Sequence, residues 1–214
     1  MNESGFRYDP KRCALVVIDM QNDFCSPDGA LAGCGFDVSA ATAMTPRLAN
    51  LIDHARDAGV PVVWVRTEHD ETTDSPQWLG RVGNGPGTAR TGLTCRPGTP
   101  GAEFYGVRPA VGEPLVVKHR FSAFVGTDLD RVLRSRGIES LLFTGVATEI
   151  CVESSLRSGL FHEYWVSLVE DCAASYDPAA HAASVAVVAQ NFGTVVTADE
   201  LISRWPARPV TRSA

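Results

Sequence analysis

Residues 140–161 read SLLFTGVATEICVESSLRSGLF and join a predicted strand to a predicted helix. Residues 140–146 form a short apolar run, which favours a buried strand of a parallel sheet. The helix that follows carries Cys151 in its expected first turn and runs to about Phe161. A strand that leads directly into a helix is the repeating unit of α/β proteins, so this stretch predicts that fold class.

The same alternation continues on both sides of this stretch and repeats about six times. It predicts one doubly wound α/β domain over residues 1–214, with its core at about 14–205, a six-stranded and mainly parallel sheet, and helices on both faces. The other predicted strands are residues 14–19, 60–67, 114–118, 165–171 and 194–197. The other predicted helices are residues 45–59, 127–137, 178–191 and 198–205. Residues 68–113 are rich in Gly, Pro and Thr and are expected to form a long loop or partial lid.

Length and composition limit the classes of function. The chain has 214 residues and is 44% hydrophobic, which is enough to bury a sizeable core. A net charge of -6 and the lack of a Lys/Arg cluster argue against a nucleic-acid partner. No run reaches the roughly 18 apolar residues of a membrane span, and the first residues lack an apolar signal region. We therefore expect a cytoplasmic protein that acts on a small soluble molecule, without a membrane partner.

Cysteine and histidine usage points away from disulfides and metals. The six cysteines are expected to be reduced, because a chain of 214 residues without a signal region rarely depends on disulfides. The five histidines are scattered and show no metal-ligand spacing, so we predict no metal site.

Three polar residues stand where predicted strands end. Asp19 ends the first strand, Lys118 ends the third, and Cys151 follows the fourth. Ligands of open parallel sheets bind beyond the carboxyl ends of the strands, so the fold predicts that these three side chains gather at one edge. A thiol at a helix N-terminus has a lowered pKa, and the free amides there can hold an oxyanion.

Each of these residues also has a structural interpretation. Cys151 alone is more often a small buried hydrophobe, Asp19 a turn or cap residue, and Lys118 a solvated surface group. However, Asp19 and Lys118 each close an apolar run, where a charge needs a partner or an exposed cleft. Their combination with Cys151 favours a catalytic site.

The segments around these residues resemble the signature motifs of the isochorismatase-like cysteine hydrolases. Asp19 lies in VVIDMQNDF, Lys118 in VVKHRFSAF, and Cys151 in TGVATEICVESSLRSG. The resemblance covers about residues 14–205 of a superfamily that includes nicotinamidases, N-carbamoylsarcosine amidohydrolase, biuret hydrolases and ureidoacrylate amidohydrolases. The stretches FDVSA, KHRFSAF and DLDRVLRSRGI are most similar to the ureidoacrylate and biuret branch.

The resemblance implies a cysteine-dependent amidohydrolase that needs no cofactor and cleaves a C–N bond in a small ureido, carbamoyl or amide substrate. Asp19 would take the thiol proton, Cys151 would attack the carbonyl to form a thioester, and Lys118 would stabilise the developing charge. Relatives usually have a cis peptide at the position of Val146 and Ala147, and the amides of Ala147 and Cys151 would form the oxyanion hole. The family also implies a homo-oligomer, a dimer or a tetramer.

Six further residues are predicted to contact the substrate. They are Phe24, Thr67, His69, Trp78, Phe121 and Gln190. The two phenylalanines follow triad residues closely, Thr67 and His69 follow the second strand, and Trp78 lies in the long loop. Gln190 resembles a glutamine of the biuret hydrolases. Core packing of the phenylalanines and a solvent-facing Gln190 are the alternatives.

Two departures bear on the substrate. The stretch VRTEHDETTD lacks the Asp and two His of the nicotinamidase metal pattern, which again argues against a metal. Phe24 and Phe121 replace tyrosines of the ureidoacrylate branch, and Thr67 and His69 replace an Asn and a Trp, which favours a less polar or differently shaped amide.

Three other functions remain open. The chain could hydrolyse a simple carboxamide such as a maleamate-like acid, it could cleave a vinyl ether as isochorismatases do without a cysteine nucleophile, or it could be a non-catalytic binding member. Rapid labelling of Cys151 by a thiol reagent at neutral pH is expected to separate the catalytic interpretations from the last one.

Overall fold

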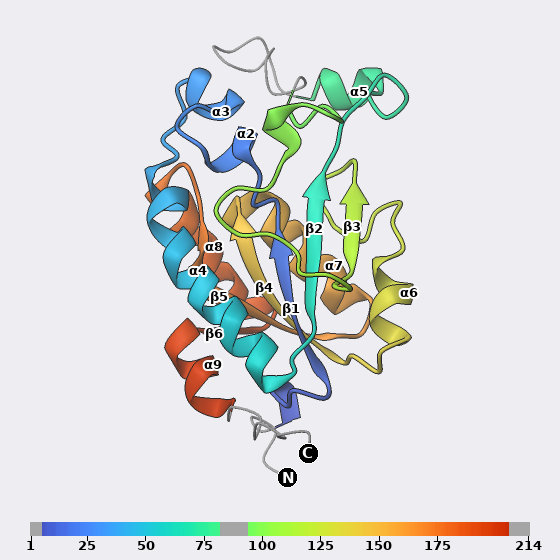
Figure 1. Ribbon diagram of the computed structural model, residues 1–214, viewed down its shortest axis with the longest axis vertical. Helices are drawn as coiled ribbons and strands as arrows, with labels where there is room; N and C mark the ends of the chain where they lie inside the picture. Colours follow the sequence, from blue (N-terminus) through green and yellow to red (C-terminus); the bar gives the residue numbers. More distant parts are fainter. Residues whose placement is uncertain (1–5, 82–93, 206–214) are drawn as a thin grey trace, which may run out of the picture.

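The computed structural model describes residues 6–81 and 94–205, and within them six strands form one sheet (Figure 1). The strands are β1 (Cys13–Ile18), β2 (Val62–Thr67), β3 (Leu115–Lys118), β4 (Ser140–Val146), β5 (Trp165–Ala174) and β6 (Thr194–Val196). Their order in the sheet is β3-β2-β1-β4-β5-β6, and every pairing is parallel. The predicted doubly wound α/β class is confirmed.

Both faces of the sheet are covered, which explains the continuous apolar runs of the strands. Leu15 and Val17 of β1 pack into one core cluster, and their neighbours Val16 and Ile18 pack into the other. Successive side chains of a strand point to opposite faces, so a strand covered on both sides must be apolar throughout.

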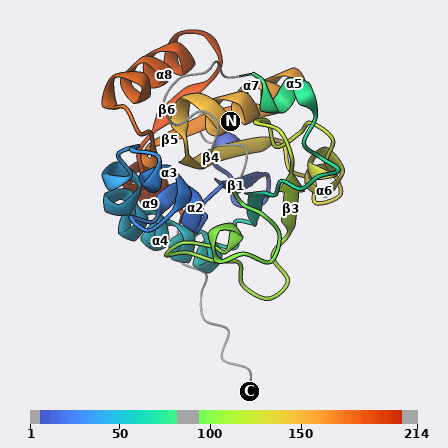
Figure 2. The ribbon, with the colours of Figure 1, turned by 90° about the horizontal axis from the view of Figure 1, so that it is seen from above.

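The helices divide between these two faces (Figure 2). Residues of α4 (Ser39–Ala58) and α9 (Ala198–Arg204) contribute to the first cluster. Residues of α6 (Leu129–Arg134), α7 (Glu153–Phe161) and α8 (Pro178–Asn191) contribute to the second. The protein is therefore a three-layer structure with the sheet in the middle.

The helix α4 begins earlier than the predicted residue 45 and contains Pro46 in its interior. Its buried face continues upstream of the proline through Ala41 and Met44, in helical spacing with Leu48. This burial outweighs the backbone hydrogen bond that a proline cannot donate. Gly59 ends the helix in the left-handed conformation, as its position predicts.

Other differences from prediction concern lengths and short elements. The strand β5 runs three residues beyond the predicted end at 171, and α6 is shorter than the predicted 127–137. Short helical segments were not predicted because four residues or fewer show no periodicity. They are α2 (Asn22–Cys25), α3 (Ala30–Gly33), α5 (Pro76–Leu79) and the 3-10 turn η2 (Pro100–Ala102). Residues 82–93 of the predicted long loop lie outside the described residues.

The strand order creates a crevice at one edge of the sheet. From the central β1 the chain moves outward through β2 and β3, and then returns to the other side of β1 to add β4, β5 and β6. Ligands of such sheets bind beyond the carboxyl ends of the strands at this reversal, which lies between β1 and β4. Among the described residues, no helix combines the length and apolarity needed to cross a bilayer.

Candidate active site

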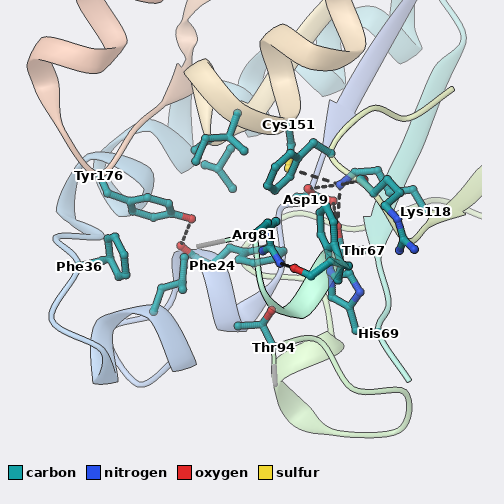
Figure 3. A pocket seen from close by; sticks show the side chains of 17 residues that line it. Asp19, Phe24, Phe36, Thr67, His69, Arg81, Thr94, Lys118, Cys151 and Tyr176 are labelled. Atoms are coloured by element: carbon teal, nitrogen blue, oxygen red, sulfur yellow. Dashed lines mark hydrogen bonds and ion pairs between the residues drawn. The ribbon is translucent and has the colours of Figure 1, made fainter. Parts of the chain in front are cut away.

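The structure brings Asp19, Lys118 and Cys151 together at the carboxyl edge of the sheet, as predicted (Figure 3). Asp19 follows β1 with a φ of 53°, and Lys118 is the last residue of β3. Both are only 1% exposed. The Lys118 Nζ lies 2.8 Å from Asp19 Oδ2 and 3.4 Å from Cys151 Sγ.

Cys151 lies in a π-helical turn rather than in the first turn of an α-helix. This turn, η3 (Thr148–Val152), connects β4 to α7, which begins at Glu153. The predicted position in the first turn of a regular helix is therefore wrong.

Thr67 bridges the other two charged groups of the site. Its hydroxyl accepts a hydrogen bond from Lys118 Nζ at 2.7 Å and donates one to Asp19 Oδ1 at 3.0 Å. This contact follows from the strand order, because β2 separates β1 from β3 and Thr67 stands in register with Lys118. Thr67 was predicted as a substrate contact; its hydroxyl takes part in the hydrogen bonds of the triad, and the residue also lines the pocket.

The carboxylate of Asp19 faces both the ammonium group and the thiol. Lys118 Nζ donates to Thr67 Oγ1, to the carbonyl oxygen of Arg120 at 3.1 Å and to Cys151 Sγ. The same nitrogen forms an ion pair with Asp19 Oδ2, and Asp19 is also a side-chain hydrogen-bond partner of Cys151. This buried carboxylate is therefore placed to accept a proton from the thiol.

The electrostatics of the site differ from the predicted activated thiol. Burial raises the pKa of Cys151 to about 12; Lys118 lowers this pKa and Asp19 raises it. Burial alone would lower the pKa of Lys118, but the charge of Asp19 and the contact with the Cys151 sulfur outweigh it, and the pKa is raised. The raised pKa of Cys151 favours a thiol over a thiolate in the resting site, beside an ammonium–carboxylate pair. Slow labelling of Cys151 at neutral pH would accordingly not exclude catalysis.

The buried amide of Gln21 holds the ends of two elements beside the triad. Its Nε2 donates to the carbonyl oxygens of Thr67 and Ala102 at 2.9 Å, and its Oε1 accepts from the Thr67 amide at 2.8 Å. Gln21 is fully buried two residues after Asp19. It ties the end of β2, and with it the bridging hydroxyl, to η2.

A pocket of about 210 Å³ opens above the triad. Pockets for drug-sized ligands measure roughly 300–1,000 Å³, so this pocket suits a smaller molecule. Five of the predicted substrate contacts line it, namely Phe24, Thr67, His69, Trp78 and Phe121. Ala147 and Cys151 lie in its wall, and the Val146–Ala147 peptide is cis, as the resemblance implies.

The prediction for Gln190 is wrong. Its side chain is exposed near the end of α8 and does not line the pocket. The helix α8 starts at the carboxyl edge, after β5, and runs back toward the amino edge before β6 begins. A residue at the end of α8 therefore lies near the amino edge of the sheet, whereas the triad lies at the carboxyl edge.

His69 is a neutral wall of the pocket. Burial lowers the pKa of its imidazole to about 4, against the opposing effect of Asp74, whose Oδ1 lies 3.8 Å from His69 Nδ1. The imidazole ring lies 5.5 Å from the Trp78 ring, centroid to centroid. At neutral pH this side chain offers a hydrogen-bonding ring without a charge.

Sequence reasoning missed several residues that line the pocket. Tyr176 donates a hydrogen bond to the carbonyl oxygen of Phe24 at 3.1 Å, and its ring lies 5.6 Å from that of Phe36. It was missed because β5 was expected to end at 171, which placed Tyr176 too far from a strand end. Arg81 and Arg120 also line the pocket. Arg120 lies in the motif VVKHRFSAF, two residues after Lys118. This short distance along the chain from a triad residue was the signal that could have identified it.

No group of three or more His, Cys, Asp and Glu side chains that could hold a metal occurs within residues 6–81 and 94–205. The arrangement offers instead a nucleophile, a base and a fixed cation. Such a set can perform covalent acyl transfer.

Comparisons with known proteins identify the family and the fold of the chain. A model of the isochorismatase domain matches residues 13–200. The ureidoacrylate amidohydrolase RutB of Methylobacterium radiotolerans is 36% identical over 199 residues, which cover 87% of this chain and 77% of that relative. A cysteine hydrolase from Pseudomonas syringae pv. phaseolicola has a TM-score of 0.79 at 28% identity, covering 91% of this chain and 92% of that one. N-carbamoylsarcosine amidase from Thermoplasma acidophilum has a TM-score of 0.70 at 28% identity, covering 88% and 97%.

Proposed function

The chain belongs to the isochorismatase family and is a hydrolase of carbon–nitrogen bonds, and we propose that it cleaves them through a thioester on Cys151. The observation that carries this proposal is the contact of Lys118 Nζ with both Cys151 Sγ and Asp19 Oδ2, at 3.4 and 2.8 Å. A nucleophile, a cation and a base within one hydrogen-bond network are the parts that covalent amide hydrolysis needs.

The first half of the reaction forms the acyl-enzyme. As Sγ of Cys151 attacks the carbonyl carbon, Asp19 Oδ2 takes the thiol proton, and the electron pair of the carbonyl moves to its oxygen. When the tetrahedral intermediate collapses, the C–N bond breaks and Asp19 returns the proton to the leaving nitrogen. Ammonia or an amine leaves, and the acyl group remains on sulfur as a thioester.

The second half restores the enzyme. Asp19 takes a proton from water, the oxygen attacks the thioester carbon, and the C–S bond breaks. The sulfur then recovers the proton as the acid product leaves. One carboxylate serves both halves because it is reset after each transfer.

Lys118 makes proton transfer from a thiol with a raised pKa feasible. Its positive charge remains beside sulfur throughout and lowers the free energy of the thiolate as it forms. Thr67 and the carbonyl oxygen of Arg120 hold the ammonium group in place. The positive charge is therefore fixed before the negative charge develops.

The amides of Ala147 and Cys151 are proposed as the oxyanion hole. Both residues line the pocket, and within the described residues neither amide donates to a carbonyl of another element. Free backbone N–H groups aimed at a developing oxyanion contribute on the order of 10²–10³ in rate each.

A small ureido or carbamoyl compound is the proposed substrate. The supporting observations are the small pocket and the names of two similar proteins, a ureidoacrylate amidohydrolase and an N-carbamoylsarcosine amidase. Phe24, His69, Trp78 and Phe121 would form its walls. A maleamate-like carboxamide would use the same nucleophile. A vinyl ether substrate would leave the contact of Cys151 with Lys118 without a purpose.

Ammonia release tests this proposal. A panel of biuret, ureidoacrylate, carbamoyl amino acids, nicotinamide and maleamate would be incubated with the wild type, with Cys151→Ala, and with Cys34→Ala as a matched cysteine control outside the pocket. We expect turnover of a ureido or carbamoyl member by the wild type and the control only, and a thioester adduct on Cys151 after acid quench. Turnover by Cys151→Ala would refute the covalent route, and silence across the panel would refute the substrate class. The homo-oligomer and the cytoplasmic location stay predictions.

A further inference from the structure

Two arginines lie against the same aromatic ring at the pocket. The guanidinium carbon of Arg81 lies 3.7 Å from the centroid of the Trp78 ring and 5.2 Å from that of Phe121. The guanidinium carbon of Arg120 lies 4.9 Å from the Trp78 ring. Both arginines line the pocket above the triad, and Figure 3 shows Arg81 beside the triad side chains.

Neither guanidinium has a carboxylate partner within the described residues. Arg81 donates to the carbonyl oxygen of Trp78, and Arg120 donates through Nη1 to the carbonyl oxygens of Thr73 at 3.0 Å and His119 at 2.6 Å. The neighbouring residues 82–93 include no Asp or Glu that could neutralise Arg81. A guanidinium group has five N–H donors, so each arginine retains donors for a ligand.

The other ionisable groups of the pocket do not cancel these two charges. Asp19 and Lys118 form an ion pair, and burial raises the pKa of the Cys151 thiol, which favours its uncharged form. His69 is neutral because burial lowers its pKa to about 4. Asp74 attracts Arg81 but forms its own ion pair with Arg96 at 2.6 Å, so the pocket keeps an excess of positive charge in a chain whose net charge is -6. Charge of one sign in a cleft concentrates ligands of the opposite sign.

We propose that Arg81 and Arg120 bind a carboxylate of the substrate, at the end remote from the scissile carbonyl, and thereby select acids over neutral amides. This inference rests on the proposed amidohydrolase function and narrows its substrate class. A guanidinium group matches the two oxygens of a carboxylate, and the flat faces of Trp78 and Phe121 hold the guanidinium in place. Ureido acids, carbamoyl amino acids and maleamate-like acids fit this subsite, whereas biuret and nicotinamide do not.

Matched substrates test the role of each arginine. Maleamate and N-carbamoylglycine would be compared with their neutral counterparts, maleamide and N-carbamoylglycinamide, in the wild type, Arg81→Gln and Arg120→Gln. Loss of a hydrogen bond to a charged group is expected to raise KM for the acid about 10- to 100-fold and to leave kcat less affected. KM for the neutral amide is expected to stay nearly unchanged. Equal losses on acid and amide, or a wild-type preference for the amide, would overturn the proposal.

Two further variants complete the kinetic test. Arg81→Lys retains the charge and is expected to recover part of the affinity for the acid. Arg131→Gln removes an arginine that lies on α6, outside the pocket, where it pairs with Asp128, and is expected to behave as the wild type. Denaturation midpoints of all variants separate a loss of binding from a loss of folding.

A second test does not depend on turnover. Iodoacetate and iodoacetamide alkylate a thiol by the same displacement of iodide, and they differ in charge. We expect the ratio of the iodoacetate rate to the iodoacetamide rate at Cys151, followed on its peptide by mass spectrometry, to exceed that of a free cysteine. The ratio should fall about 10-fold in Arg81→Gln and Arg120→Gln, and it should fall with added salt.

The two tests distinguish the possible failures. A silent substrate panel with a rate ratio that depends on the arginines would refute the proposed function and leave the anion subsite standing. Turnover of acids with KM values and rate ratios unaffected by either substitution would refute the anion subsite and leave the proposed function standing.

Discussion

Replacing Thr67 with valine removes one hydroxyl from the centre of the site and preserves the shape of the side chain. Lys118 Nζ then loses its acceptor at 2.7 Å, and Asp19 Oδ1 loses its donor at 3.0 Å. A hydrogen bond to a charged group contributes about 1.5–3 kcal/mol, and a buried charged group without its partner carries a further desolvation cost. Because the ion pair of Asp19 and Lys118 at 2.8 Å remains, we expect the low end for both bonds, about 3 kcal/mol of unfolding free energy.

The same substitution should affect catalysis more than binding. Without the bridge, the carboxylate of Asp19 can rotate away from the thiol, and we expect kcat to fall about 100-fold, or roughly 2.7 kcal/mol of activation free energy, with KM nearly unchanged. Urea denaturation gives the stability change, and steady-state ammonia release gives kcat and KM. Thr67→Ser is the matched control, because it keeps both hydrogen bonds and loses only a methyl group, at about 1 kcal/mol.

Two results would refute this reasoning. If Thr67→Val turned over substrate at the wild-type rate, the hydroxyl would have no part in positioning Asp19. If Thr67→Ser lost as much activity as Thr67→Val, packing of the methyl group, and not the bridge, would be the property that matters.

The remaining predictions concern charge and backbone space. Asp19→Asn should lower the rate of hydrolysis by at least about 1,000-fold, because the base is lost. It should also lower the pKa of Cys151, because the carboxylate opposes loss of the thiol proton. The alkylation rate of Cys151 at pH 8 should therefore rise, and a slower rate would contradict this role of Asp19. His69 has a pKa of about 4 in the folded protein against an ordinary value of 6.5, so the unfolded chain binds a proton that the folded chain does not, and stability should fall as pH decreases from 6.5 toward 4. Denaturation midpoints across this window should show a shallower pH slope for His69→Gln than for the wild type. Gly145→Ala should yield no folded protein, because φ is 106° and an added Cβ would lie 1.9 Å from the carbonyl oxygen of Ile18; a near-native melting temperature would contradict this.

The resting state of Cys151 shows how local reasoning can identify a residue and misjudge its chemistry. A helix N-terminus lowers the pKa of a thiol when the thiol lies against the free amides of its first turn. Cys151 lies two residues before that helix, in η3, where it is partly buried beside the carboxylate of Asp19. The reactivity of this thiol therefore depends on its neighbours at the ends of β1 and β3, and not on the helix that follows the thiol.

The sequence by itself determined the class of fold and the edge where the chemistry occurs. Strands covered on both faces must be apolar throughout, so β1 and β4 were visible as runs, and parallel strands all end at the same edge. Asp19, Lys118 and Cys151 could therefore be placed together without knowledge of the strand order. These conclusions rest on periodicity and chain direction, which are local properties.

Only the tertiary structure decided how the site works and what it can select. The placement of β2 between β1 and β3 makes Thr67 a bridge, and the direction of α8 removes Gln190 from the pocket. The approach of Arg81 and Arg120 to one tryptophan ring creates the positive charge above the triad. Distances and pKa values depend on groups brought together from distant parts of the chain, and local periodicity carries no information about them.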